Sequence, residues 1–253
     1  IMMNSEYFNV ELISTTSPAY KRNNRKYKRI SDKVRQYNSV DHYASSYHKA
    51  LLKWEFVVQN IFSSISNENK NRILKFTDKK SHVRFREIDF IAEPTANELI
   101  FCELKLKEKF NAEIGKKASG WAQLNKSISI AEENFNTLSG LSICVDMSHM
   151  YGLETEATED DYCQIADLEK LLTSPLLEKR TLWLSSIEIS SLAIKKGLLT
   201  PSDVAEMKKL HEEYKNPLSV LNDETEHISN NPFQNLASLF DNNANNNLHE
   251  TLH

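Results

Sequence analysis

The chain has 253 residues, of which 40% are hydrophobic and 26% are charged, proportions typical of a globular protein with a sizeable core. Its formal net charge is −4, from 31 Lys and Arg against 35 Asp and Glu, so the overall charge does not by itself indicate a nucleic-acid-binding protein. Only five residues are glycine, and their spacing excludes the glycine-rich loops that bind dinucleotides or nucleoside triphosphates.

The three cysteines, Cys102, Cys144 and Cys163, are odd in number and far apart. This spacing does not fit a disulfide framework or a cysteine-based zinc site, and it favours a reducing compartment. The first twelve residues lack the basic and then apolar pattern of a secretion signal. No apolar run approaches the roughly 20 residues that span a bilayer. We therefore expect a cytoplasmic protein without a membrane partner.

The N-terminal segment, residues 1–44, is distinguished by its basic residues. Positions 20–35 contain eight Lys and Arg and one Asp, a local charge of +7. Such a cluster can neutralise phosphates, and its tyrosines, Tyr20 and Tyr27, can stack on bases. A solvated basic linker explains the same composition. The residues that we assign to nucleic-acid contact in this segment are Lys21, Arg22, Arg25, Lys26, Lys28 and Arg29.

The next hundred residues alternate between helical and strand-like patterns. Apolar residues recur at three- and four-residue spacing over residues 45–62, which predicts a helix. Residues 73–76 form a short apolar piece and predict an edge strand. Two strand-like runs follow, at residues 82–92 and 98–107, and the turn-forming sequence EPTANE joins them. We expect these two strands to pair in antiparallel orientation.

The second half of the chain continues this alternation. In chain order the expected elements are a helix at 112–135, a buried strand at 141–147, a helix at 164–172, a strand at 181–189, and helices at 190–196 and 201–214. Thr200 is the expected N-cap of the last helix, with Pro201 in its first turn.

This order of elements predicts an α/β fold with a mixed central sheet, formed by a single domain of residues 45–221. Beyond that domain, residues 222–253 are polar and Asn-rich. Low hydrophobicity without a sustained period predicts a flexible tail there.

The residues most informative about function lie in REIDFIAEPTANELIFCELKLKE, positions 86–108. Side chains alternate between the two faces of a strand, so Glu103 and Lys105 point away from the apolar face of their strand. Pairing of the two strands then brings Asp89 toward them. Two carboxylates beside a lysine suit a hard divalent cation and phosphoester chemistry. Alternation alone also predicts charged residues on a solvated face, and this second explanation stays open.

Asp89, thirteen intervening residues and then Glu103-Leu104-Lys105, with a helix upstream and another downstream, resembles the PD-(D/E)xK nuclease superfamily. The resemblance covers about residues 45–150, and Ile88 stands where the superfamily's name-giving proline would be. It implies a restriction-endonuclease-like α/β/α sandwich, here with extra C-terminal helices and a polar tail. It also implies Asp89, Glu103 and the Leu104 carbonyl as ligands of Mg²⁺, for which Mn²⁺ can substitute, and Lys105 as the residue that positions the attacking water.

Two helices extend the implied site. Many members of the superfamily place a carboxylate on the helix before the sheet, and Glu55 lies beside the buried stripe of the helix at 45–62, which makes it a further candidate metal ligand. On the helix predicted at 112–135, Gln123 resembles the glutamine that some members place near the active centre. Lys116 and Lys126 fall on the same face as Gln123 and are candidates for contact with a phosphate backbone. A solvated lysine-rich face is the alternative.

The resemblance implies a metal-dependent nuclease that hydrolyses DNA phosphodiester bonds, while RNA is not distinguished from DNA by the sequence. It also implies a role as the effector of a bacterial restriction or anti-phage system, with a protein partner that controls or targets cleavage and a possible homo-oligomer. The alternative is a catalytically inactive nuclease-fold module that binds DNA or a protein partner.

Overall fold

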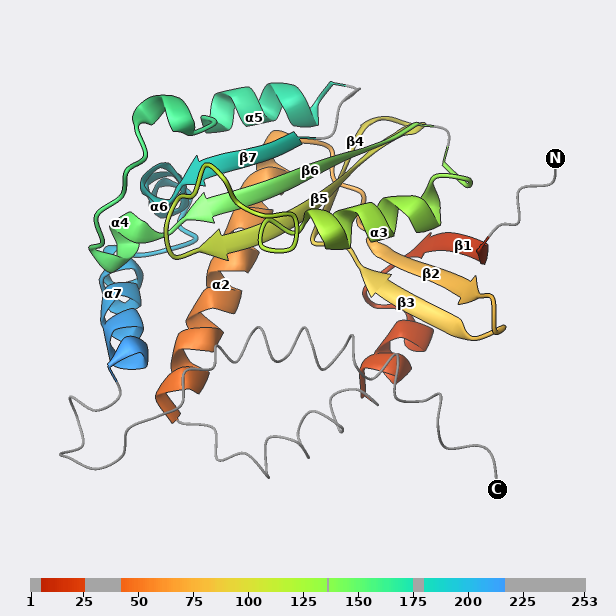
Figure 1. Ribbon diagram of the computed structural model, residues 1–253, viewed down its shortest axis with the longest axis horizontal. Coiled ribbons are helices and arrows are strands. Elements are labelled where there is room, and N and C mark those ends of the chain that lie inside the picture. Colours follow the sequence, from red (N-terminus) through yellow and green to blue (C-terminus); the bar gives the residue numbers. More distant parts are fainter. Residues whose placement is uncertain (1–5, 26–41, 136, 175–179, 217–253) are drawn as a thin grey trace. The chain divides into compact units, whose positions relative to one another are not determined.

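The computed structural model describes residues 6–25, 42–135, 137–174 and 180–216 (Figure 1). The chain divides into two units, residues 1–216 and 217–253, and the predicted tail at 222–253 lies outside the described residues. In chain order the elements are β1 (Tyr7–Ile13), α2 (His42–Ile65), β2 (Ile73–Asp78), β3 (Val83–Glu87), β4 (Phe90–Thr95), β5 (Glu98–Lys107), α3 (Trp121–Ala131), β6 (Thr137–Asp146), α4 (Ser148–Tyr151), the 3₁₀ helix η1 (Glu159–Asp161), α5 (Ile165–Leu172), β7 (Arg180–Ser185), α6 (Ser186–Lys195) and α7 (Pro201–Lys215). Residues 18–25 are also helical.

The larger of two sheets has four strands in the order β4-β5-β6-β7. β4 and β5 pair in antiparallel orientation, with Phe90 opposite Cys102 and Ala92 opposite Ile100, as the sequence predicts. β5, β6 and β7 are parallel to one another. The mixed sheet and the α/β class of the fold are therefore confirmed.

Different helices cover the two faces of this sheet (Figure 1). On one face, β-strand side chains such as Ile100 and Leu104 pack with Trp54 and Phe62 of α2 and with residues of α5, α6 and α7. On the other face, the neighbouring side chain Phe101 packs with residues of α3 and of the second sheet. Alternating residues of β5 thus belong to two separate cores, as the two-residue period of a strand requires.

The second sheet, in the order β1-β2-β3, is antiparallel and was not expected. Its central strand is β2, so the prediction of an edge strand at 73–76 was wrong about its position in the sheet. The predicted strand 82–92 is two strands, because β3 pairs with β2 whereas β4 pairs with β5. The chain crosses from one sheet to the other at Ile88 and Asp89.

The helix expected over 112–135 is shorter, since α3 begins only at Trp121. Gly120, at φ +88, is the residue that precedes the helix, and Lys116 and Ser119 lie in the turns before it. Similarly, the strand expected at 181–189 ends at Ser185, whose hydroxyl accepts a hydrogen bond from the Ile187 N–H and caps α6. The final helix agrees with prediction: Thr200 is its N-cap and forms a capping box with Asp203.

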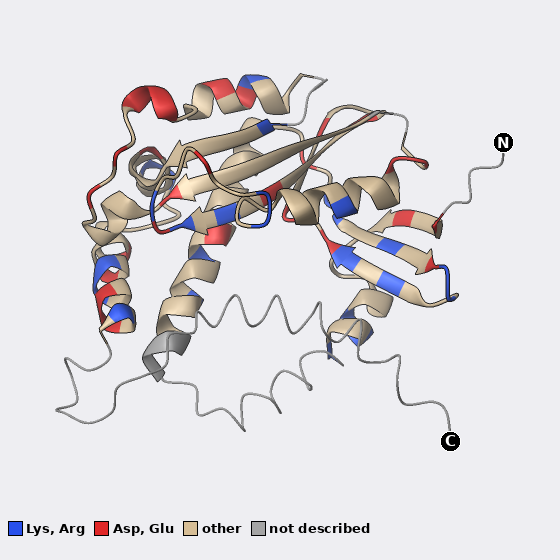
Figure 2. Cartoon of the chain, in the orientation of Figure 1, with Lys and Arg blue, Asp and Glu red and all other residues tan. Residues whose placement is uncertain are grey.

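The N-terminal segment is not wholly separate from the domain. β1 pairs with β2, and Tyr20 is buried with 8% of its surface exposed. The expectation that Tyr20 stacks on bases is therefore wrong, whereas Tyr27 lies outside the described residues. Figure 2 shows basic residues along β2 and β3 and acidic residues along η1 and α5. No helix in the described part of the chain is long and apolar enough to cross a membrane.

Candidate active site

Asp89 lies at the crossing between the two sheets, and several contacts fix its backbone and side chain. Its carboxylate oxygen Oδ2 accepts a hydrogen bond of 2.7 Å from the Leu104 N–H on β5. Its carbonyl accepts hydrogen bonds from Gln59 Nε2 on α2, at 3.0 Å, and from Arg72 Nη1, at 3.4 Å. Asp89 is outside the strand ladders, so side chains satisfy a carbonyl that a neighbouring strand would otherwise bind.

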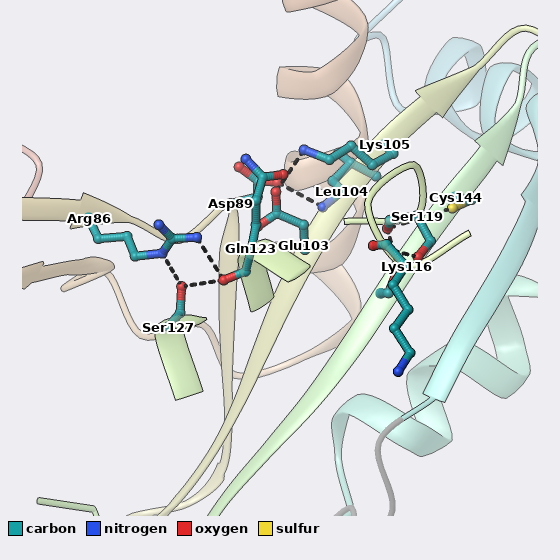
Figure 3. Close-up of polar contacts among 11 residues, drawn as sticks. Arg86, Asp89, Glu103, Leu104, Lys105, Lys116, Ser119, Gln123, Ser127 and Cys144 are labelled. Carbon is teal, nitrogen blue, oxygen red and sulfur yellow. Dashed lines mark hydrogen bonds and ion pairs between the residues drawn. The ribbon is translucent and has the colours of Figure 1, made fainter. Parts of the chain in front are cut away.

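Glu103 and Lys105 lie on the same face of β5, and the two side chains form an ion pair of 2.7 Å between Nζ and Oε1. Figure 3 shows the side chains of Asp89, Glu103 and Lys105 pointing toward one another. Glu103 is only 7% exposed. This face of the strand is therefore not a solvated row of charges, and the simpler of the two explanations that the sequence allowed does not hold for Glu103.

Glu55 reaches the same group of residues from α2. It lies one helical turn before Gln59, which binds the Asp89 carbonyl, so both residues face the site. Burial raises the pKa of Glu55 to about 7, and the negative charges of Asp89 and Glu103 add to this rise, while Lys105 opposes it. Glu55 therefore interacts electrostatically with Asp89, Glu103 and Lys105, and its role as a metal ligand stays a prediction.

The charges within this group are strongly perturbed. Burial and the neighbouring Asp89 carboxylate raise the pKa of Glu103 to about 7. Burial also raises the pKa of Asp89, although Lys105 and the Leu104 N–H oppose the change. Burial alone would lower the pKa of Lys105, but the surrounding carboxylates outweigh it and the pKa is raised. Three partly or fully buried acids therefore interact with one ammonium group, and Arg72 and Arg86 add positive charge near Asp89 and Glu103.

Gly120 forms one wall of the site. A Cβ atom at this position would lie 2.5 Å from Cγ of Glu103 and 3.1 Å from Cε of Lys105, so only a glycine fits there without displacing them. The preceding residue, Ser119, is buried, and its carbonyl accepts a hydrogen bond from the Ser142 hydroxyl of β6. The segment before α3 is thus anchored to the sheet directly over the Glu103–Lys105 pair.

The first turns of α3 are joined to β3 beside the site. Arg86 donates from Nη2 to the Gln123 carbonyl, at 2.7 Å, and from Nε to the Ser127 hydroxyl, at 2.6 Å. The Gln123 side chain is exposed and extends from α3 in the direction of Asp89 and Glu103 (Figure 3). Arg86 also opposes the rise in the pKa of Glu103, so its positive charge acts on the site.

The predicted nucleic-acid contacts are distributed around the fold. Lys116 is exposed and its side chain points away from the carboxylates (Figure 3). Lys126 lies over the ring of Tyr7, with Nζ 5.7 Å from the centroid. Lys21, Arg22 and Arg25 are exposed on the helical residues 18–25. The other three predicted contacts, Lys26, Lys28 and Arg29, lie outside the described residues.

The donors in this site match the preferences of a hard cation, but they do not form a complete cage. In the described ranges, no group of three or more His, Cys, Asp or Glu side chains is arranged to hold a metal ion. Mg²⁺ commonly uses one or two carboxylates and keeps several waters. Asp89 and Glu103 with the Leu104 carbonyl fit that pattern, because their oxygens are hard ligands and their negative charge exceeds that of their cationic neighbour.

Sequence reasoning missed the residues that hold the site together, namely Gln59, Arg72, Arg86 and Gly120. Gly120 had a detectable signal, because a glycine just before an apolar helical period commonly marks a helix boundary. The other three act through contacts with residues distant in the chain, and nothing in their local pattern indicates those contacts. No protein-family model, curated protein or solved structure matches this chain.

Proposed function

We propose that this protein is a metal-dependent nuclease of the PD-(D/E)xK type, with a restriction-endonuclease-like fold, that hydrolyses phosphodiester bonds in DNA. The observation that carries the proposal is the convergence of Asp89, Glu103 and Lys105 on one face of the β4–β5 pair, with Glu55 approaching from α2. A four-stranded mixed sheet covered by α2 on one face and α3 on the other is also what this superfamily's architecture requires.

Each residue of the group has a distinct part in the proposed reaction. Asp89, Glu103 and the Leu104 carbonyl would hold Mg²⁺, with Glu55 supplementing them. When bound, the ion supplies Lewis-acid polarisation of the phosphoryl oxygen and neutralises part of its charge. The surrounding carboxylates keep Lys105 protonated at neutral pH. Lys105 therefore donates hydrogen bonds, and it orients the attacking water instead of removing its proton.

The second candidate function is a binding module without catalysis. It is favoured by one observation: the charged groups already have partners within the protein. Lys105 pairs with Glu103, and the Asp89 carboxylate accepts the Leu104 N–H. In that case the same residues would only stabilise a surface that binds DNA or a protein partner, and no product would form. A biological role in restriction or anti-phage defence, with a controlling protein partner, belongs to the first proposal.

The test is incubation of plasmid DNA, linear DNA and RNA with Mg²⁺, Mn²⁺ or EDTA. The variants Glu103→Gln and Lys105→Ala should each lower cleavage by about 100-fold or more while leaving the protein folded. A matched control is available on α5, where Lys170 and Asp167 form an exposed ion pair of 3.0 Å. Lys170→Ala and Asp167→Asn remove the same kinds of charge and should leave cleavage unchanged.

The outcomes separate the candidates. Metal-dependent cleavage that the Glu103 and Lys105 variants abolish supports the nuclease. DNA binding without cleavage in any metal supports the binding module. Cleavage that survives both substitutions would mean that the chemistry occurs elsewhere in the chain.

A further inference from the structure

A chain of hydrogen bonds connects the basic N-terminal residues to the candidate metal ligand Asp89. Tyr20 donates its hydroxyl to Glu87 Oε2, at 2.5 Å. The other oxygen of Glu87 pairs with Arg72 Nη1, at 2.7 Å. Arg72 Nη1 in turn donates to the carbonyls of Ile88, at 2.9 Å, and Asp89, at 3.4 Å. The side chains of Tyr20, Glu87 and Arg72 are therefore linked in series, and Arg72 is the member that contacts the backbone of Asp89.

This chain of contacts lies where the backbone passes from one sheet to the other, and it restrains the backbone there. Ile88 and Asp89 form the crossing between the two sheets. The Ile88 N–H donates to the Arg72 carbonyl, at 2.9 Å, whereas Asp89 is outside both strand ladders and lacks the restraint that a ladder provides. Arg72 and Gln59 supply that restraint from the side of the carbonyl, while the Leu104 N–H fixes the carboxylate. A ligand at a bend needs such supports, because a small error in its position costs a large factor in binding or rate.

Tyr20 is held firmly at the outer end of the chain of contacts. Its ring packs against Phe85 of β3, with 6.1 Å between the ring centroids, and it is 8% exposed. The adjacent residues Lys21 and Arg22, and Arg25 one turn later, are exposed. Tyr20 thus fixes the start of the basic cluster beside Glu87, two residues before Asp89.

We propose that Tyr20, Glu87 and Arg72 form a positioning relay for Asp89 in the nuclease reaction. The inference rests on the proposed function. It assigns these three side chains the role of holding Asp89 in position. None of the three contacts the reacting atoms. They act through Asp89, and Tyr20 brings a residue of the N-terminal segment into this chain of contacts.

The test compares two tyrosines whose hydroxyls each donate to a carboxylate, one within the relay and one outside the site. Tyr20→Phe removes the hydroxyl at the outer end of the relay. Tyr162→Phe is the matched control, because the Tyr162 hydroxyl also binds a carboxylate, Asp146 Oδ2, at 2.6 Å, but outside the site. Both variants should lose a similar amount of thermal stability. Glu87→Gln, which keeps an oxygen for Tyr20 but loses the charge that pairs with Arg72, provides a second variant of the relay.

Three quantities are measured: Mn²⁺ affinity by calorimetry without DNA, kcat, and KM for DNA. Tyr20→Phe and Glu87→Gln should each weaken Mn²⁺ binding and lower kcat by about 10-fold, as loss of an outer support of a metal ligand does. KM should change little, and Tyr162→Phe should change neither Mn²⁺ affinity nor kcat. If Tyr20→Phe and Tyr162→Phe behave alike in a wild-type background that cleaves DNA, the relay is refuted and the nuclease stands. If the wild type neither binds Mn²⁺ nor cleaves, both proposals fall.

Discussion

Replacement of Gly120 by alanine tests the geometry of the candidate site most directly. Gly120 has φ +88, a backbone conformation that costs an ordinary residue about 1–2 kcal/mol. The new methyl group would lie 2.5 Å from Glu103 Cγ. Because Cγ is in the middle of a buried side chain, relief of the clash moves the carboxylate. Overpacking of this kind costs a further amount of about 1–3 kcal/mol.

The expected loss in the free energy of unfolding is therefore about 2–5 kcal/mol, or a fall in melting temperature of roughly 5–15 °C for a domain of this size. Cleavage should fall further than stability explains, by about 100-fold at a temperature where the variant is fully folded, because Glu103 and Lys105 are displaced. Thermal unfolding and a DNA cleavage assay measure the two effects separately.

Three other glycines of the same chain separate the two causes. Gly197 has φ +70, and a methyl group there would meet nothing within 4 Å, so Gly197→Ala measures backbone strain alone. A methyl group at Gly140 would lie 2.8 Å from a side-chain atom of α3, and Gly140 has no positive φ, so Gly140→Ala measures steric contact alone. Gly115→Ala involves neither cause and should be neutral. All three should keep cleavage. If Gly120→Ala unfolds like Gly197→Ala and cleaves at the wild-type rate, Glu103 does not pack where the structure has it.

The pH dependence of stability provides two further predictions. Burial raises the pKa of Glu55 from its ordinary value of 4.5 to about 7 in the folded protein. Between pH 4.5 and pH 7 the folded state therefore binds more protons than the unfolded state, and the free energy of unfolding falls as pH rises through this range. Glu55→Gln should therefore be as stable as the wild type near pH 4 and more stable at pH 8, by up to about 3 kcal/mol in unfolding free energy. Added Mg²⁺ should reduce this difference, because it stabilises the wild type with Glu55 ionised. An equal gain at both pH values would refute a buried carboxylate. His211 is buried and stacked on Tyr151, and burial lowers its pKa although Glu108 opposes the change. Because the unfolded state then binds the proton more readily, the wild type should lose stability as pH falls below 6.5. His211→Phe should weaken that loss in denaturant unfolding at pH 5 and pH 8, and an unchanged pH profile would contradict the assignment.

Local pattern predicted those parts of the fold that short-range physics determines. The helical period at 45–62 became α2, and the turn chemistry of EPTANE correctly paired β4 with β5. That pairing brings Asp89 near Glu103 and Lys105, but Asp89 lies one residue before the ladder begins at Phe90 and Cys102, and the Leu104 N–H holds its carboxylate there. Strand period and hairpin register therefore predict the neighbourhood of Asp89 and not its contacts.

The parts that were missed depend on contacts between distant residues. β1 shows no clean alternation between buried and exposed positions, and it is a strand because it pairs with β2 some sixty residues later. Tyr20 belongs to a basic run, yet its position is decided by Phe85 and Glu87 of a sheet that the sequence did not predict. The division of the run 82–92 into two strands has the same origin, since both halves have strand-like composition.

The balance of charge at the site supports the proposed nuclease over the proposed binding module. A cluster that only stabilised the fold would neutralise its charges, whereas here burial raises the pKa of Asp89, Glu103 and Glu55 although Lys105 opposes the rise in all three, Arg72 opposes it in Asp89 and Arg86 opposes it in Glu103. Folding is opposed by this burial of acids, which is a common property of functional sites. A module that bound DNA through these residues alone would place phosphates against surplus carboxylates, and the two would repel. A divalent cation removes both conflicts, because it neutralises the carboxylates and attracts the phosphate. The arrangement therefore favours the metal-dependent nuclease over the binding module.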